Sequence, residues 1–218
     1  MSLPTYLELV NEVLTELRED EVTAVSQSTL SRLIGRFVNK AKRKVEDAYN
    51  WNALTTTIAL ATVEGTYSYP LPGSGARFKL IEVFNTTDKA ELTNMPTHQM
   101  NKLFLMDVNP ATPAYYNFNG IDSNGDTKVD LFPIPDATVR TLYFNLYVPQ
   151  EDLADESDVL FVPKAPVSQL ALAYALVERG EDGGLESSEA YMIFKDCLAD
   201  HIAIEASRYV EEETWEAN

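Results

Sequence analysis

The residues from 28 to 51 constrain the fold more than any other stretch, because the period of their pattern changes at its end. Apolar residues recur there at gaps of three and four, which places them on one side of a helix. Ser26 or Ser28 can cap the first free amides of that helix. After Trp51 the sequence becomes β-branched and alternating. The stretch therefore predicts a long amphipathic helix that leads directly into a sheet.

The same predicted helix has a second face of uniform charge. Its basic residues recur at every fourth position, at Arg32, Arg36, Lys40 and Lys44. Such a face could contact nucleic acid, but Glu46 and other acids lie nearby and no aromatic residues interleave. We expect the basic face to pair with acids on a neighbouring surface. Exposed ion pairs of this kind add little stability but help to select a partner.

The charge balance narrows the possible functions. The 218 residues include 17 Lys and Arg against 34 Asp and Glu, a formal net charge of −17. Nucleic acid repels such a chain, because phosphate binding needs clustered cations. No stretch approaches the ~18 consecutive apolar residues of a membrane span, and a signal-peptide pattern is missing. One cysteine, Cys197, fits synthesis in a reducing cytoplasm.

Acids are most concentrated in residues 181–218. This asymmetry has two interpretations, a solvated acidic helix or a surface that contacts other copies or a partner. At its end, Tyr209 and Trp215 are aromatic residues in an acidic setting. The last residues are either a frayed terminus or a segment that orders on a partner, with these two side chains as anchors.

The whole chain predicts helices at both ends and strands between them. Helical patterns cover residues 4–18, 28–51, 167–179 and 185–211, with a short crossing helix at 96–106. Strand patterns cover 54–63, 67–71, 78–86, 114–119, 127–132 and 139–148. The turn at Glu64 and Gly65 pairs the first two strands in a hairpin, and Pro70 confines the second to a sheet edge.

We therefore predict an α+β fold in which N- and C-terminal helices form a bundle with an inserted, mostly antiparallel β domain. Its parts are residues 1–52 for the N-terminal helices of the bundle, 53–163 for the inserted β domain, and 164–218 for the C-terminal helices and an acidic tail.

Candidate sites of chemistry are few. Residues 122–126, DSNGD, are similar to the start of a calcium loop, but that loop's later Gly and Glu are missing, and Asn-Gly is typical of a hairpin tip. Cys197 and His201 are spaced to share a metal, but zinc needs four ligands and the only other histidine is His98. Nucleophile elbows and phosphate loops are missing. We expect no enzyme, no cofactor and no metal site.

Four stretches look familiar together, namely TYLELVNEVLTELRE, RLIGRFVNKAKRKVEDAYNWNAL, PATPAYYNFNG and ALAYALVERGEDGG. They resemble the head-to-tail adaptor, or connector, proteins of tailed bacteriophages, in the tail-tube A group of short-tailed phages. The resemblance covers nearly the whole chain and consists of packing patterns without catalytic residues. It implies a helical bundle that carries a β domain. It also implies a dodecameric ring beneath the portal, with the genome passing through its centre and the tail nozzle or tail tube below.

The leading hypothesis is thus a structural adaptor at the head–tail junction of the virion, made in the host cytoplasm. DNA passes through its channel without specific binding, and no membrane is involved. In this hypothesis the basic face meets acids of the next copy. The residues expected at interfaces are Arg32, Arg36, Lys40 and Lys44, and, against the portal protein, Tyr209 and Trp215.

Two alternatives stay open. One is a tail-completion or minor tail protein away from the portal. The other is a tail module that binds or degrades polysaccharide, which four strand tyrosines favour, although such residues commonly serve sheet packing. They are Tyr67, Tyr69, Tyr115 and Tyr116.

The expected portal contact gives a first prediction. Replacing Trp215 by Ala should weaken binding to the portal ring, because buried Trp side chains dominate many interfaces. The measurement is the dissociation constant of the chain for the isolated portal ring. Unchanged binding would remove the C-terminal tail from this account.

Overall fold

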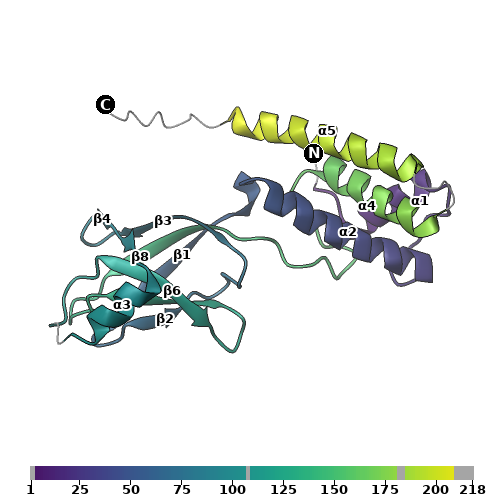
Figure 1. The fold of residues 1–218 in the computed structure, drawn as a ribbon. Coiled ribbons are helices and arrows are strands. Elements are labelled where there is room, and N and C mark those ends of the chain that lie inside the picture. The colour runs from purple at the N-terminus through teal and green to yellow at the C-terminus, as the bar shows by residue number, and fades with distance from the viewer. Residues whose placement is uncertain (1–2, 107–108, 181–184, 209–218) are drawn as a thin grey trace, which may run out of the picture. The chain divides into compact units, whose positions relative to one another are not determined.

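The computed structural model describes residues 3–106, 109–180 and 185–208 (Figure 1). Within these residues the chain forms five α-helices and two mostly antiparallel sheets, and the helices at both ends flank the β region. The predicted α+β class is confirmed. The chain divides into two compact units, one formed by Met1–Leu54 with Gln150–Asn218 and the other by Thr55–Pro149.

The helical unit holds four helices, whose bounds are Tyr6–Glu16 for α1, Thr29–Ala48 for α2, Lys164–Arg179 for α4 and Leu185–Ala206 for α5. Thr5 caps α1 and Ser28 caps α2, each through a capping box. In Figure 1, α4 lies between α2 and α5, and α1 packs against α2 and α4. Their apolar faces meet in one core.

The predicted start of α4 changes. The helix expected from residue 167 begins at Lys164, because Pro163 takes the cap position and Pro166 falls in the first turn. A proline there removes no helical hydrogen bond, since the first amides have no partner in the helix. The end is as predicted: Gly180 has a φ of 63° and stops α4 in the left-handed conformation.

A close contact holds α1 against α2. Gly35 is buried in α2, and a Cβ placed on it would lie 2.3 Å from the hydroxyl of Tyr6 and 2.9 Å from Cγ1 of Val25. A larger residue would have to displace these side-chain ends, so Gly35 leaves the space that the Tyr6 ring of α1 occupies against α2.

The β unit contains two four-stranded sheets. One has the order β1-β8-β3-β4, with bounds Thr55–Ala61, Thr141–Tyr147, Lys79–Asn85 and Ala90–Glu91. The other has the order β2-β7-β6-β5, with bounds Ser68–Pro70, Thr127–Phe132, Tyr115–Ile121 and Thr93–Asn94. The short helix α3, Thr97–Phe104, packs near β6, and a single 3-10 turn, η1, spans Asn52–Leu54 before β1.

The predicted hairpin between the first two strands is wrong. β1 pairs with β8 and β2 pairs with β7, so the chain crosses from one sheet to the other between them. The hydroxyl of Tyr69 fixes this crossing, since it accepts from the amide of Val63 at 2.9 Å and donates to the carbonyl of Thr66 at 2.8 Å. The predicted edge position of Pro70 is confirmed, because β2 is the outer strand of its sheet.

The two sheets enclose a second core. Leu142, Phe144 and Leu146 of β8 face Val129 and Leu131 of β7, and all five are buried. The rings of Tyr116 and Phe144 meet edge to face with centroids 6.3 Å apart. This is the packing of a small β-sandwich, and it needs no helix to cover it.

Outside this core, Arg140 ties three loops together. Its guanidinium donates to Asp88 and Asp136, each at 2.6 Å, and to the hydroxyl of Thr112 at 2.7 Å. The hydrogen bond from Arg140, followed by one from the amide of Thr138, lowers the pKa of Asp136 to about 2. Asp136 therefore keeps its charge, and its bond to Arg140, well below the pH at which a free Asp protonates.

The segment 150–163 lies in the helical unit, whereas the sequence analysis assigned it to the β domain. The side-chain amide of Asn39 donates to the carbonyl of Leu153 at 2.9 Å and accepts from its amide at 2.8 Å. Thr5 and Val159 form an isolated antiparallel bridge. Among the described residues, none of the helices has the length and apolar character needed to cross a membrane.

Candidate interaction surfaces

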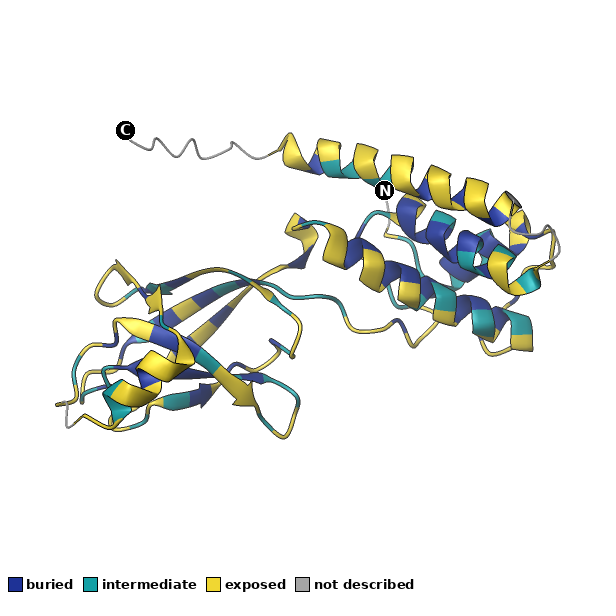
Figure 2. Cartoon of the chain, viewed as in Figure 1, coloured by how far each residue is buried: buried dark blue, intermediate teal, exposed yellow. Residues whose placement is uncertain are grey.

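The residues of the basic face predicted on α2 are exposed. They are Arg32, Arg36, Lys40 and Lys44, and Figure 2 shows exposed positions along α2. Lys40 leans towards α4, where its ammonium lies 4.1 Å from the ring centroid of Tyr174. In the part of the chain that the structure describes, none of the four forms an ion pair with a carboxylate.

The four cations, spaced four residues apart, do not stabilise α2. Like charges four residues apart on a helix destabilise it by roughly 0.2–0.5 kcal/mol per pair. Arg43 lies beside this face but is paired with an acid, because its guanidinium forms two hydrogen bonds to the carboxylate of Asp152. The four remaining cations thus form a basic surface without acidic partners among the described residues.

The inward side of α2 carries a buried ion pair. Both side chains of the pair, Lys42 and Glu46, are 0% exposed, with Nζ and Oε1 3.1 Å apart. Lys42 Nζ also donates to the carbonyl of Gln150 at 2.6 Å, and the amide of Gln150 donates to Glu46 Oε1 at 3.2 Å. The side chain of Gln150 then bonds the backbone of Val159 and Phe161. One buried pair thereby fixes α2 to the segment that returns from the β unit.

The outward side of α5 differs from the prediction. The helical spacing of residues 185–211 predicts one apolar stripe that includes Tyr191, Phe194 and Ala206; in the structure Phe194 is buried, but Tyr191 and Ala206 are exposed. Apolar residues occur all round this helix, so the periodicity alone did not distinguish the inner side. The residues left exposed on the outer side include Met192 at 67%, Ile193 at 48% and Ile204 at 56%, and Figure 2 shows that side of α5 largely exposed.

Acids accompany these exposed apolar residues. Glu189, Asp196 and Asp200 are exposed and follow the spacing of one helical stripe, and within the described chain none of them forms an ion pair. Asp196 and Asp200 repeat on α5 the unfavourable like-charge spacing of α2. The helical unit therefore has a basic surface on α2 and an acidic, partly apolar surface on α5, with α4 between them (Figure 1).

Two of the interface residues predicted from the sequence cannot be placed. Tyr209 and Trp215 lie outside the described residues, so their portal contact stays a prediction.

Cys197 Sγ lies 3.6 Å from His201 Nδ1, which contacts the carbonyl of Cys197 at 2.8 Å. Burial, followed by the charge of Asp200, raises the pKa of the Cys197 thiol. No cluster of three metal-ligating side chains occurs among the described residues.

The loop at residues 122–126 is a closed turn. Asp122 Oδ1 accepts from the amides of Asn124 at 2.8 Å and Asp126 at 3.0 Å. Asp126 Oδ1 accepts from the amides of Gly73 and Gly75 at 3.0 and 3.1 Å. These carboxylates organise the backbone of two loops, as expected for a hairpin tip.

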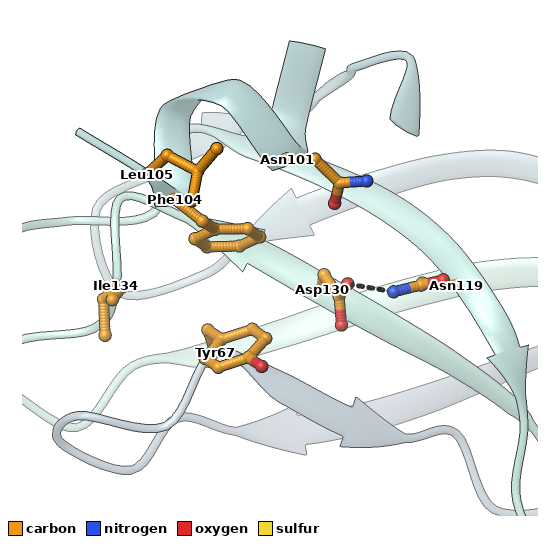
Figure 3. Close-up of a pocket in the computed structure, with 7 residues that line it drawn as sticks. All are labelled: Tyr67, Asn101, Phe104, Leu105, Asn119, Asp130 and Ile134. Atoms are coloured by element: carbon orange, nitrogen blue, oxygen red, sulfur yellow. Dashed lines mark hydrogen bonds between the residues drawn. The ribbon is translucent and has the colours of Figure 1, made fainter. Parts of the chain in front are cut away.

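The four tyrosines of the polysaccharide hypothesis do not form one surface. Tyr69 and Tyr116 are buried in the core of the sandwich, and Tyr67 and Tyr115 are exposed beside different hollows. The hollow beside Tyr67 has a volume of about 460 Å³, and Figure 3 shows the residues that line it. They are Tyr67, Asn101, Phe104, Leu105, Asn119, Asp130 and Ile134.

Sequence reasoning did not identify this pocket. Strand alternation places Asp130 on the face of β7 opposite the core residues Val129 and Leu131, where solvent is expected. In the structure α3 and the loop carrying Tyr67 cover that face, and Asp130 is only 2% exposed. The sequence shows an acid between two apolar residues of a strand, which could have marked this pocket. It does not show which part of the chain covers the outer face of that strand.

Comparison with known proteins identifies a family. A family model described as SU10 adaptor protein matches residues 4–212. A search of curated proteins found no match.

The buried pair on α2 gives a second prediction. Lys42→Met leaves the Glu46 carboxylate buried without its cation and should lower the free energy of unfolding by roughly 3–5 kcal/mol. The exposed matched variant Lys44→Met should change it by less than about 0.5 kcal/mol. The measurement is urea unfolding followed by circular dichroism.

Adding Glu46→Gln to Lys42→Met removes the remaining charge and keeps an acceptor for the amide of Gln150. This double variant should recover most of the lost stability. Equal losses for the single variant Lys42→Met and for Lys44→Met would contradict the importance assigned to the buried pair.

Proposed function

Because the chain belongs to the SU10 adaptor protein family of phage head-to-tail adaptors, we propose that it forms a ring that joins the portal to the tail. Membership confirms the resemblance drawn from the sequence and makes the chain a structural component of a phage. The ring, its portal contact and the passage of the genome are the proposed part. The alternative is a tail-completion or minor tail protein away from the portal.

The proposal rests on the opposite charges of the exposed sides of α2 and α5, which lie on either side of α4. A ring of identical subunits requires a heterologous contact, in which each copy presents two different surfaces that fit each other. The basic outward side of α2 and the acidic outward side of α5 meet this requirement within one unit. In the proposed ring, α2 of one copy packs against α5 of the next.

The two surfaces also match in length. At a rise of about 1.5 Å per residue, the basic run from Arg32 to Lys44 extends about 18 Å and the acidic run from Glu189 to Asp200 about 17 Å. Met192, Ile193 and Ile204 lie among the acids, and their burial would supply the affinity that exposed ion pairs lack. The ion pairs would set the register and make assembly dependent on salt.

The remaining features are consistent with a structural function in the virion. A formal net charge of −17 makes a channel wall that releases no counterions to bind DNA, so the genome passes without specific binding. The family is structural, and we infer no enzymatic activity and no cofactor. In this proposal Tyr209 and Trp215 contact the portal, and the opposite side of the ring receives the tail nozzle or tail-tube protein.

Charge reversal tests the contact between copies. One variant reverses the basic surface with Arg32→Glu and Arg36→Glu, and the other reverses the acidic surface with Asp196→Lys and Asp200→Lys. Each variant alone places like charges at every contact and should assemble poorly. A mixture of the two should assemble again, because each α5 then meets an α2 of opposite charge. The measurement is native mass spectrometry of the chain with and without the portal ring.

Two controls sharpen this experiment. A chain carrying all four substitutions restores opposite charges at every contact and should assemble by itself. Glu64→Lys with Glu91→Lys changes the net charge as much as the acidic-surface variant does, but at exposed positions in the β unit, and should assemble like the unchanged chain. If the mixture assembles no better than either variant alone, this contact is not the one that closes the ring.

A further inference from the structure

The pocket beneath α3 contains a carboxylate that the described chain does not satisfy. Asp130 Oδ2 accepts from the side-chain amide of Asn119 at 2.8 Å, whereas Oδ1 is buried and has no hydrogen-bond partner. The described residues supply no cation for this carboxylate. A buried acceptor without a donor costs roughly 1–3 kcal/mol, and more when the group is charged.

Two aromatic rings lie directly beside this carboxylate. Figure 3 shows the rings of Tyr67 and Phe104 next to Asp130, and their centroids are 4.8 Å apart. Phe104 is held in turn by Phe132 of β7, at 5.8 Å between centroids. Ring faces attract cations, most often the planar guanidinium of arginine, which stacks on them.

The Asp130 carboxylate in the pocket needs a hydrogen-bond donor. The nitrogen of Asn119 donates one hydrogen to Asp130, and an ionised Asp130 carboxylate can only accept. A guanidinium has five donors and no acceptor, and it pairs with a carboxylate through two parallel hydrogen bonds. It can therefore donate to Asp130 and stack on an aromatic ring at the same time.

Access depends on Tyr67. Asp130 Oδ1 lies below the surface of the pocket, and Tyr67 beside it is 45% exposed. For an incoming group to reach Oδ1, this ring has to turn outward. The rim is apolar, since Leu105 is 88% and Met106 is 62% exposed at the end of α3. Exposed apolar residues around a charged pocket suit a polypeptide segment better than a free ion.

We propose that this pocket binds the guanidinium of an arginine from another protein of the virion, with Asp130 as its counter-ion and Tyr67 and Phe104 as its stacking surface. The choice of a virion protein as the source rests on the proposed function, whereas guanidinium binding does not. A second hollow of about 540 Å³ on α3, lined in part by Met95, Leu103 and Tyr115, continues the surface that such a segment would cover.

The probe is N-acetyl-arginine amide, added to the full-length chain and followed by nuclear magnetic resonance of the Asn119 side-chain amide. This signal should shift and saturate with a dissociation constant on the order of 1 mM, as expected for one side chain. N-acetyl-citrulline amide has the same shape without the charge and should bind at least about tenfold more weakly. The failure of this experiment would leave ring assembly, tested by charge reversal, unaffected.

Variants locate the site. Asp130→Asn keeps the side-chain size and should abolish the response, whereas Asp122→Asn at the hairpin tip should not change it. Tyr67→Leu, at a half-exposed position, should weaken binding several-fold. This second variant tests the site even where Asp130→Asn disturbs the fold. Equal responses to the arginine and citrulline probes, or an unchanged response in Asp130→Asn, would overturn the proposal. A response to N-acetylglucosamine alone would also overturn it and would indicate a saccharide surface.

Discussion

The buried pair of Lys42 and Glu46 is the interaction on which the helical unit depends. Two buried opposite charges need hydrogen bonds besides their own ion pair, and the backbone of Gln150 supplies one bond to each of them. Gln150 is the residue at which the chain re-enters the helical unit after the β unit. The pair therefore determines where the chain returns and, through Val159, how it approaches the start of α1.

This arrangement gives α2 two separate tasks. Its inner side is fixed by the buried pair, by the close approach at Gly35 and by the core, so the helix needs no help from its outer side. The outer side can then carry four like charges at a small cost in stability. The same holds for α5, where Phe194 is buried and the acids face away. Charges that weaken the isolated subunit are consistent with a chain whose working state is an assembly.

The sequence predicted the helical unit better than the β unit, for physical reasons. The period of α2, the serine cap at its start and the end of α4 at Arg179 are local signals that agree with the structure, whereas the period of α5 did not identify its buried side. Strand pairing is not local: nothing in residues 54–71 shows that β1 meets β8 or that Tyr69 turns the chain between sheets. The covered face of Asp130 depends on α3, which packs from a distant part of the chain. The interface residues could be proposed from charge spacing, but the structure of one chain does not identify their partners.

We propose that the chain forms a ring between the portal and the tail. The native mass of the unmodified chain mixed with the isolated portal ring of its own phage tests this directly. If the ring forms, one discrete complex should contain one copy of the chain for each portal subunit. A chain that stays free, or that joins only tail components, would contradict the claim and support a tail-completion protein.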